Sequence, residues 1–89
     1  MPTVAFTSAL RRFVSAASAE VPGATVGEAL AAVFAAQPGL RGYILDDQGA
    51  LRRHVAVYVA GRPVRDRSAL SDPVGPGDVI YVFQALSGG

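Results

Sequence analysis

The chain has 89 residues, 51% of them hydrophobic, and a formal net charge of +1, which suits one small packed domain and leaves no room for a second core. It contains no cysteine, which excludes disulfides, cysteine-bound metals and a thiol nucleophile on this chain. No apolar run approaches ~20 residues and no basic segment leads into a long apolar one after Met1, so we predict neither a transmembrane helix nor a signal peptide and expect a cytoplasmic protein.

The N-terminal segment has the alternation of a half-buried strand. Residues 3 to about 10 alternate, with Val4, Phe6 and Ser8 on one face and Ala5 and Thr7 on the other. A weaker pattern over residues 13–21 favours a second strand that returns to the breaker pair Pro22-Gly23. Together they predict a hairpin.

Residues 25–28 match a capping box at the start of a helix. The Thr25 hydroxyl is placed to accept the N–H of Glu28, and the Glu28 side chain to reach back to the N–H of Thr25. Pro38-Gly39 predicts that the helix ends after Gln37. The apolar residues of this segment fall on one helical stripe: Val26, Ala29, Leu30, Val33 and Phe34.

The middle of the chain predicts a linker, a turn and a hairpin. Residues 40–45 form a short apolar linker with at most one 3₁₀ turn, and residues 46–49 carry a turn signal. A strand from Leu51 then reverses at Ala60-Gly61, and residues 63–65 form a short edge strand, where proline is tolerated. The alternation puts Val55, Val57 and Val59 on one face of the long strand and His54, Ala56 and Tyr58 on the other.

The last strand follows a stretch dense in proline and glycine. Residues 73–78 predict a turn closed by Asp78, and residues 79–83 the strand. If its β-branched Ile80 and Val82 face the helix, Tyr81 and Phe83 point outward together with Tyr58 and Ala56. We interpret this aromatic group as a docking surface for a partner. The alternative is that Phe83 folds back over a loop and fills a small satellite core.

The order of elements predicts an α+β fold of the β-grasp type. One main helix packs on one face of a mixed sheet of four or five strands. One helix covers only one face, so the other face meets solvent and apolar residues there call for a partner. We predict a domain over residues 1–84 and a flexible tail over residues 85–89 that ends in Gly-Gly.

The terminal Gly88-Gly89 is the most informative feature of the tail. Glycine has no Cβ, so such an end is a thin and flexible thread that carries a carboxylate. A folded domain gains no stability from this thread, whereas an enzyme that draws a C-terminus through a narrow slot needs that shape. We therefore predict that Gly89 is the chemically active residue, with Gly88, Ser87 and Leu86 threading into another protein.

Catalysis by the chain itself is not expected. His54 is the single histidine and has no orienting partner in the sequence, so it is interpreted as a strand residue at the sheet margin. Asp46-Asp47 is ordinary turn chemistry. No cluster of metal ligands, phosphate-binding loop or basic stripe interleaved with aromatic residues is present, so we expect no metal, no nucleic acid and no membrane as a partner.

All eight cationic side chains are arginine. Two explanations remain open. A protein with an activated C-terminal acyl group benefits from carrying no side-chain amine that attacks it. A compositional bias is the other explanation, since alanine is also heavily used.

The tail after Phe83, the turn at residues 75–79 and the capped helix from Thr25 resemble the MoaD/ThiS-type ubiquitin-like sulfur carriers. The resemblance covers the whole chain in length and order of elements. Within that family, residues 40–53 and the strand 54–59 look most similar to the carrier that supplies sulfur for cysteine biosynthesis.

The resemblance implies a carrier that other enzymes act upon. An E1-like adenylating enzyme uses ATP and Mg²⁺ to adenylate the Gly89 carboxylate, and a sulfur donor then converts it to a thiocarboxylate. A sulfur-accepting synthase takes the sulfur for cysteine, molybdopterin or a related metabolite. Gly88 and Gly89 match the terminal pair of the family, and Phe83 matches an aromatic position that contacts the activating enzyme. Gln84-Ala85 departs from the proline-rich lead of some members.

Two other functions fit the same sequence. One is a ubiquitin-like modifier that is conjugated through Gly89 to other proteins. The other is a plain interaction module in which the Gly-Gly end has no role.

Overall fold

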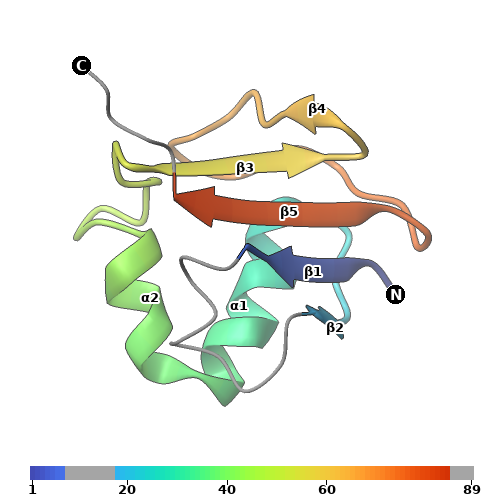
Figure 1. The fold of residues 1–89 in the computed structure, drawn as a ribbon, viewed down its shortest axis with the longest axis horizontal. Coiled ribbons are helices and arrows are strands. Elements are labelled where there is room, and N and C mark those ends of the chain that lie inside the picture. Colours follow the sequence, from blue (N-terminus) through green and yellow to red (C-terminus); the bar gives the residue numbers. More distant parts are fainter. Residues whose placement is uncertain (8–17, 85–89) are drawn as a thin grey trace.

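A computed structural model describes residues 1–7 and 18–84 of the chain (Figure 1). These residues form one five-stranded mixed sheet and two helices. In chain order the elements are β1 (Thr3–Phe6), β2 (Ser18–Glu20), α1 (Val26–Ala36), α2 (Pro38–Ile44), β3 (Val55–Val59), β4 (Arg62–Pro63) and β5 (Val79–Gln84).

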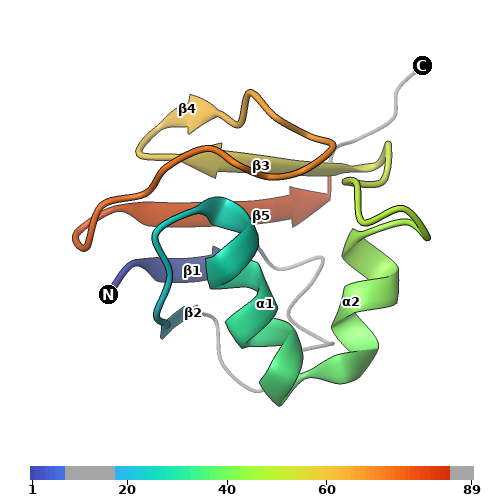
Figure 2. The ribbon, with the colours of Figure 1, turned by 180° about the vertical axis from the view of Figure 1, so that it is seen from behind.

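The strand order is β2-β1-β5-β3-β4, which confirms the predicted β-grasp architecture. β1 and β5 are parallel, and the other neighbouring pairs are antiparallel. The last strand therefore lies at the centre of the sheet, between β1 and β3. Both helices lie on the same face of the sheet, as the view from behind shows (Figure 2).

Helix α1 begins with the predicted cap, and one bond of the capping box differs. Thr25 Oγ1 accepts the N–H of Glu28 at 3.2 Å, as expected. Glu28 Oε1 accepts the N–H of Ala24 at 2.9 Å, one residue before the predicted donor. All five residues of the predicted apolar stripe are buried.

The expected linker at residues 40–45 is wrong, because residues 38–44 form the second helix, α2. Pro38 does end α1, but it also occupies the first turn of α2, where its missing N–H costs no hydrogen bond and its fixed φ suits a helix. Leu40 and Ile44 lie one turn apart and are both buried, which anchors this short helix to the core.

Strand boundaries also differ from the sequence prediction. β1 ends at Phe6 rather than near residue 10, and β5 extends to Gln84 rather than Phe83. β3 starts at Val55 rather than Leu51, because Leu51 instead forms an isolated bridge with Leu45. β4 covers Arg62–Pro63 and not residues 63–65. β2 is confined to Ser18–Glu20, and the earlier part of that predicted strand lies outside the described residues.

The core lies between the helices and the inner face of the sheet. It contains the alternate residues of the three central strands: Val4, Phe6, Val55, Val57, Val59, Ile80 and Val82. The predicted alternation of β3 and β5 is thus confirmed. Within the described residues, neither helix has the length and apolar character needed to cross a membrane.

The loop that joins β4 to β5 is organised by a carboxylate. Asp66 accepts hydrogen bonds from the Ser71 hydroxyl and from the N–H groups of Ala69, Ser71 and Ser68. These donors, the Ser71 hydroxyl first, lower the pKa of Asp66 from 3.8 to about 2. The loop in turn contacts α1, because Leu70 O accepts the N–H of Gly27 at 2.9 Å.

We predict that Asp66→Asn lowers stability at neutral pH and that the difference from wild type shrinks in acid. The folded-state pKa of Asp66 is lower than its ordinary value, so its contribution is complete above about pH 4 and is lost as the pH falls through about 2. Urea unfolding between pH 7 and pH 2 measures this difference.

Asp47→Asn, in the exposed turn at residues 46–49, serves as the control and is expected to show no such trend. A stability difference for Asp66→Asn that stays constant from pH 7 to pH 2 would contradict the role of the charged carboxylate.

Candidate functional site

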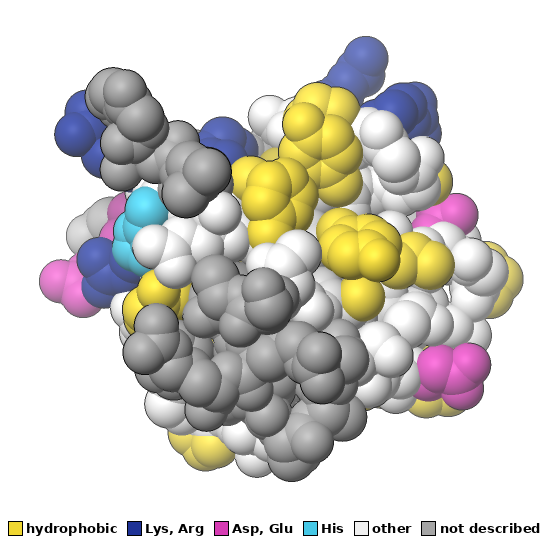
Figure 3. Space-filling model, viewed as in Figure 1, with side chains coloured by type: hydrophobic (Ala, Val, Ile, Leu, Met, Phe, Trp, Pro, Cys, Tyr) yellow, Lys and Arg dark blue, Asp and Glu magenta, His cyan; other side chains and the backbone are white. Residues whose placement is uncertain are grey.

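The outward face of the sheet carries the aromatic side chains that the alternation predicts. Tyr58 of β3 lies directly opposite Tyr81 of β5, and Ala56 lies opposite Phe83. Tyr58 is 37% exposed and Tyr81 is 49% exposed. We call Tyr58, Tyr81 and Phe83 the aromatic face. Figure 3 shows hydrophobic side chains gathered over β3 and β5 on this side of the molecule.

The three rings line a shallow concavity together with Thr7 and Gly61. The rings of Tyr58 and Phe83 pack at a tilt, with centroids 5.4 Å apart. This contact covers part of the Phe83 ring, which is half-buried on the outward face of the sheet, so Phe83 does not fill a separate satellite core. Both helices cover the opposite face of the sheet, so no described helix shields these rings from solvent.

The end of β5 is held from the side by α2. The Tyr43 hydroxyl donates a hydrogen bond of 2.9 Å to Oε1 of Gln84, the last residue of β5. The His54 ring lies edge-on to the Tyr43 ring, with centroids 5.3 Å apart. Gln84 also pairs with Val55 in the sheet. The pairing with Val55 and the hydrogen bond from Tyr43 together hold Gln84, the last residue of β5, in place.

Sequence reasoning missed Tyr43 because it placed this residue in a linker. The spacing of Leu40 and Ile44, with Pro38 ahead of them, was the available signal for a short helix. His54 belongs to a turn one residue before β3 and not to the strand itself, so its predicted position at the sheet margin is corrected to this turn.

The remaining polar candidates accept hydrogen bonds from backbone N–H groups in turns. Asp46 Oδ1 accepts the N–H groups of Gln48 and Ala50, and Asp78 Oδ2 accepts the N–H of Gly75. In the described part of the chain, no group of three histidine or acidic residues could hold a metal ion. The predicted tail residues Leu86, Ser87, Gly88 and Gly89 lie outside the described residues.

The amino-acid sequence is similar to those of known proteins. A family model described as the ThiS family matches residues 4–89. The chain is 36% identical over 66 residues to small archaeal modifier protein 1 of Haloferax volcanii, an alignment that covers 74% of this chain and 71% of the relative.

Solved structures share the whole fold. A chain in the crystal structure of the Amycolatopsis orientalis BexX/CysO complex is 30% identical, with a TM-score of 0.86 and full coverage of both chains. Mycobacterium tuberculosis CysO is 26% identical, with a TM-score of 0.84 over 97% of this chain and 100% of that one.

We predict that Tyr43→Phe weakens the anchoring of β5. Loss of the hydrogen bond to Gln84 is expected to lower the free energy of unfolding by about 0.5–1.5 kcal/mol, at the lower end because Gln84 is exposed. Urea unfolding measures the stability, and the NMR signals of the Gln84 side-chain amide report the loss of the contact.

Tyr58→Phe removes a hydroxyl from the exposed sheet face and is the matched control. It is expected to leave both readouts near wild type. Identical Gln84 signals in wild type and Tyr43→Phe would show that α2 does not hold the end of β5.

Proposed function

The chain belongs to the ThiS family, and from this premise we propose that it is a sulfur carrier whose Gly89 carboxylate is adenylated and then converted to a thiocarboxylate. The observation that carries the proposal is the position of the aromatic face. Tyr81 and Phe83 lie on β5, the strand that leads directly into the segment ending in Gly88-Gly89. A protein that docks on these rings is therefore close to the root of that segment.

The aromatic face has the properties of a docking surface. Each ring that loses about 50 Å² of apolar surface to a partner contributes about 1 kcal/mol, at roughly 25 cal/mol per Å². Aromatic side chains are also common in the centres of protein interfaces. In the proposed function, Tyr58, Tyr81 and Phe83 bind the E1-like adenylating enzyme, and β5 aims the chain end at its nucleotide site.

The chemistry is carried out by the partners. An oxygen of the Gly89 carboxylate attacks the α-phosphorus of ATP, and pyrophosphate leaves with its Mg²⁺. The product is an acyl adenylate, in which AMP is a good leaving group. Sulfide, or an equivalent donor, attacks the acyl carbon and expels AMP, which leaves a thiocarboxylate. A sulfur-accepting synthase then takes this sulfur, in the biosynthesis of cysteine, molybdopterin or a related metabolite.

The full-length likeness to a chain of the BexX/CysO complex supports a protein partner and the carrier function. Two of the similar structures contain CysO, a sulfur carrier of cysteine biosynthesis. This agrees with the resemblance of residues 40–59 to that group of carriers. No group suited to bind ATP is required on this chain, because the nucleotide belongs to the activating enzyme.

A ubiquitin-like modifier is the second candidate function. Its specific support is the 36% identity to small archaeal modifier protein 1. Both functions use the same activated end, so intact mass spectrometry of the protein from its own cells separates them. Replacement of one oxygen by sulfur supports the carrier, and covalent adducts to other proteins support the modifier.

We predict that Gly88→Ala lowers kcat/KM for adenylation by about 10- to 100-fold, because a Cβ in a closed slot displaces the carboxylate from its attacking position. One residue added after Gly89 is expected to abolish the reaction, because the reactive carboxylate is then moved. ATP–pyrophosphate exchange with an E1-like enzyme that activates the wild type measures both effects.

Gly39→Ala is the matched glycine control, since a Cβ added there meets no atom within 4 Å. It is expected to react like wild type. Normal exchange by the extended chain would refute the proposed role of Gly89.

We also predict that Tyr81→Ser weakens binding to the same enzyme by about tenfold or more while the fold is retained, because Tyr81 is the most exposed ring of the aromatic face. Isothermal titration calorimetry measures the dissociation constant. Ala31→Ser, on the exposed side of α1, is the control on the opposite face of the sheet. Equal binding by the Tyr81→Ser variant would remove the aromatic face from the interface.

A further inference from the structure

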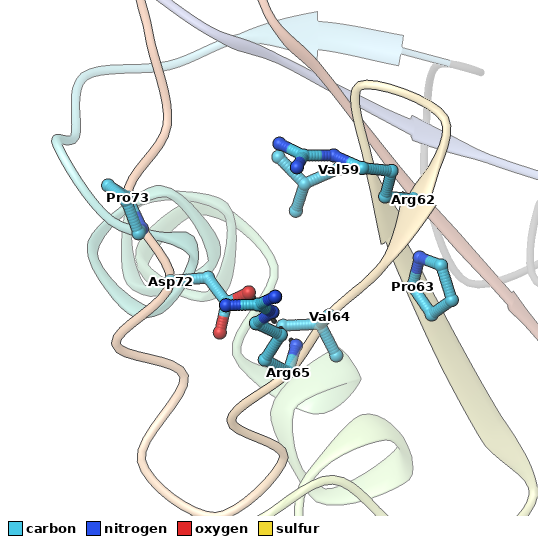
Figure 4. A pocket seen from close by; sticks show the side chains of 7 residues that line it. All are labelled: Val59, Arg62, Pro63, Val64, Arg65, Asp72 and Pro73. Atoms are coloured by element: carbon cyan, nitrogen blue, oxygen red, sulfur yellow. Dashed lines mark hydrogen bonds between the residues drawn. The ribbon is translucent and has the colours of Figure 1, made fainter.

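A second surface feature lies at the β4 edge of the sheet, on the helix side. It is a hollow between β4 and the segment at residues 72–73 (Figure 4). Val59 and Val64 form its floor, and only 7% and 8% of their surfaces are exposed. Pro63 and Pro73 contribute apolar walls from opposite sides. We call this feature the arginine hollow, after the two side chains described next.

Arg62 and Arg65 extend from the β4 segment toward the side of the hollow that Asp72 and Pro73 form (Figure 4). Both side chains are exposed. The register pairs Arg62 with Val59, which puts Arg62 on the core side of the sheet and not on the aromatic face. Within residues 1–7 and 18–84, neither guanidinium group has a hydrogen bond or an ion pair.

The acidic residue of the hollow is already engaged. The two carboxylate oxygens of Asp72 accept the N–H groups of Arg65 and Asp66, at 2.9 and 2.8 Å. Asp72 therefore holds the backbone of the loop, and the two arginine side chains keep their hydrogen-bonding capacity for a ligand. Guanidinium groups bind carboxylates and phosphates in a planar, two-pronged geometry.

The surroundings favour carboxylates over phosphate. The Asp72 carboxylate lines the same hollow and repels a phosphate dianion more strongly than it repels a singly charged carboxylate. Phosphate sites commonly use free backbone N–H donors, and four of the seven residues that line the hollow offer none. Pro63 and Pro73 have none, and the N–H groups of Val64 and Arg65 are already bonded. The apolar floor and walls instead suit an aliphatic side chain.

We propose that the arginine hollow binds an acidic segment of a partner protein, in which carboxylate side chains flank an apolar one. The carboxylates pair with Arg62 and Arg65, and the apolar side chain covers Val59 and Val64. This surface is separate from the aromatic face but adjoins it across the edge, because Pro63 pairs with Tyr58 in the sheet. Figure 3 shows arginine side chains beside the hydrophobic group at this edge. The proposal does not depend on the chemistry of Gly89.

Selection from a library of random displayed peptides tests the proposal with no partner chosen in advance. The wild-type protein is the bait, and the double variant Arg62→Gln/Arg65→Gln is the counter-bait. We expect the peptides that depend on the two arginines to be rich in Asp and Glu around an apolar residue. They are expected to bind wild type at least about tenfold more tightly than the double variant, and more weakly as salt is raised.

Control variants and NMR spectra test whether the peptides bind at the arginine hollow. Arg53→Gln, an exposed arginine in the turn before β3, is the matched control and is expected to bind the peptides like wild type. NMR shift changes of ¹⁵N-labelled wild-type protein are expected to centre on Val64 and Arg65. The spectrum of the free double variant reports whether its fold is retained, and Tyr81→Ser is expected to leave binding unchanged.

Several outcomes would overturn the proposal. These are a selection that yields no peptide dependent on Arg62 and Arg65, a set of dependent peptides that lack acidic residues, and shift changes confined to the aromatic face. Inorganic phosphate or oligothymidylate that displaces the peptides at matched ionic strength would assign the hollow to phosphate groups instead.

Discussion

Burial of one face of the sheet by one layer of helices is the constraint on which the structure depends. The apolar side chains of β1, β3 and β5 meet those of α1 and α2, and no described element covers the other face. Because neighbouring side chains of a strand point to opposite faces, each central strand necessarily presents a second set of residues to solvent. In β3 and β5 that second set includes Tyr58, Tyr81 and Phe83.

Two of the three rings of the aromatic face, Tyr81 and Phe83, lie on β5, the central strand of the sheet. β5 pairs with β1 on one side and β3 on the other, so the strand that precedes the chain end is held along both of its edges. Tyr43 adds a contact from α2 to Gln84. A rigid strand that ends at a fixed point is suited to aim the following segment at another protein's active site, since small displacements of a reacting group are costly.

The acidic residues of the loops are used in building the fold. Asp46, Asp66, Asp72 and Asp78 each accept backbone N–H groups in turns. These bonds satisfy donors that the short connections would otherwise leave without partners. The carboxylates are therefore not gathered into a reactive cluster, while Arg62 and Arg65 remain available at the β4 edge. The chemistry expected of this protein thus lies at its surfaces and its chain end.

The sequence by itself determined the β-grasp order, the capped helix, the faces of β3 and β5 and the Gly-Gly end, because these depend on local periodicity and on individual residues such as Thr25 and Pro38. Only the tertiary structure decided that residues 38–44 are helical, that β5 is central and that Tyr43 reaches Gln84. The physical reason is that a short helix with two buried side chains is stabilised by the core it joins, and strand neighbours and long-range hydrogen bonds are set by packing between segments distant in the chain. The arginine hollow likewise exists only where β4 and the loop at residues 72–73 come together.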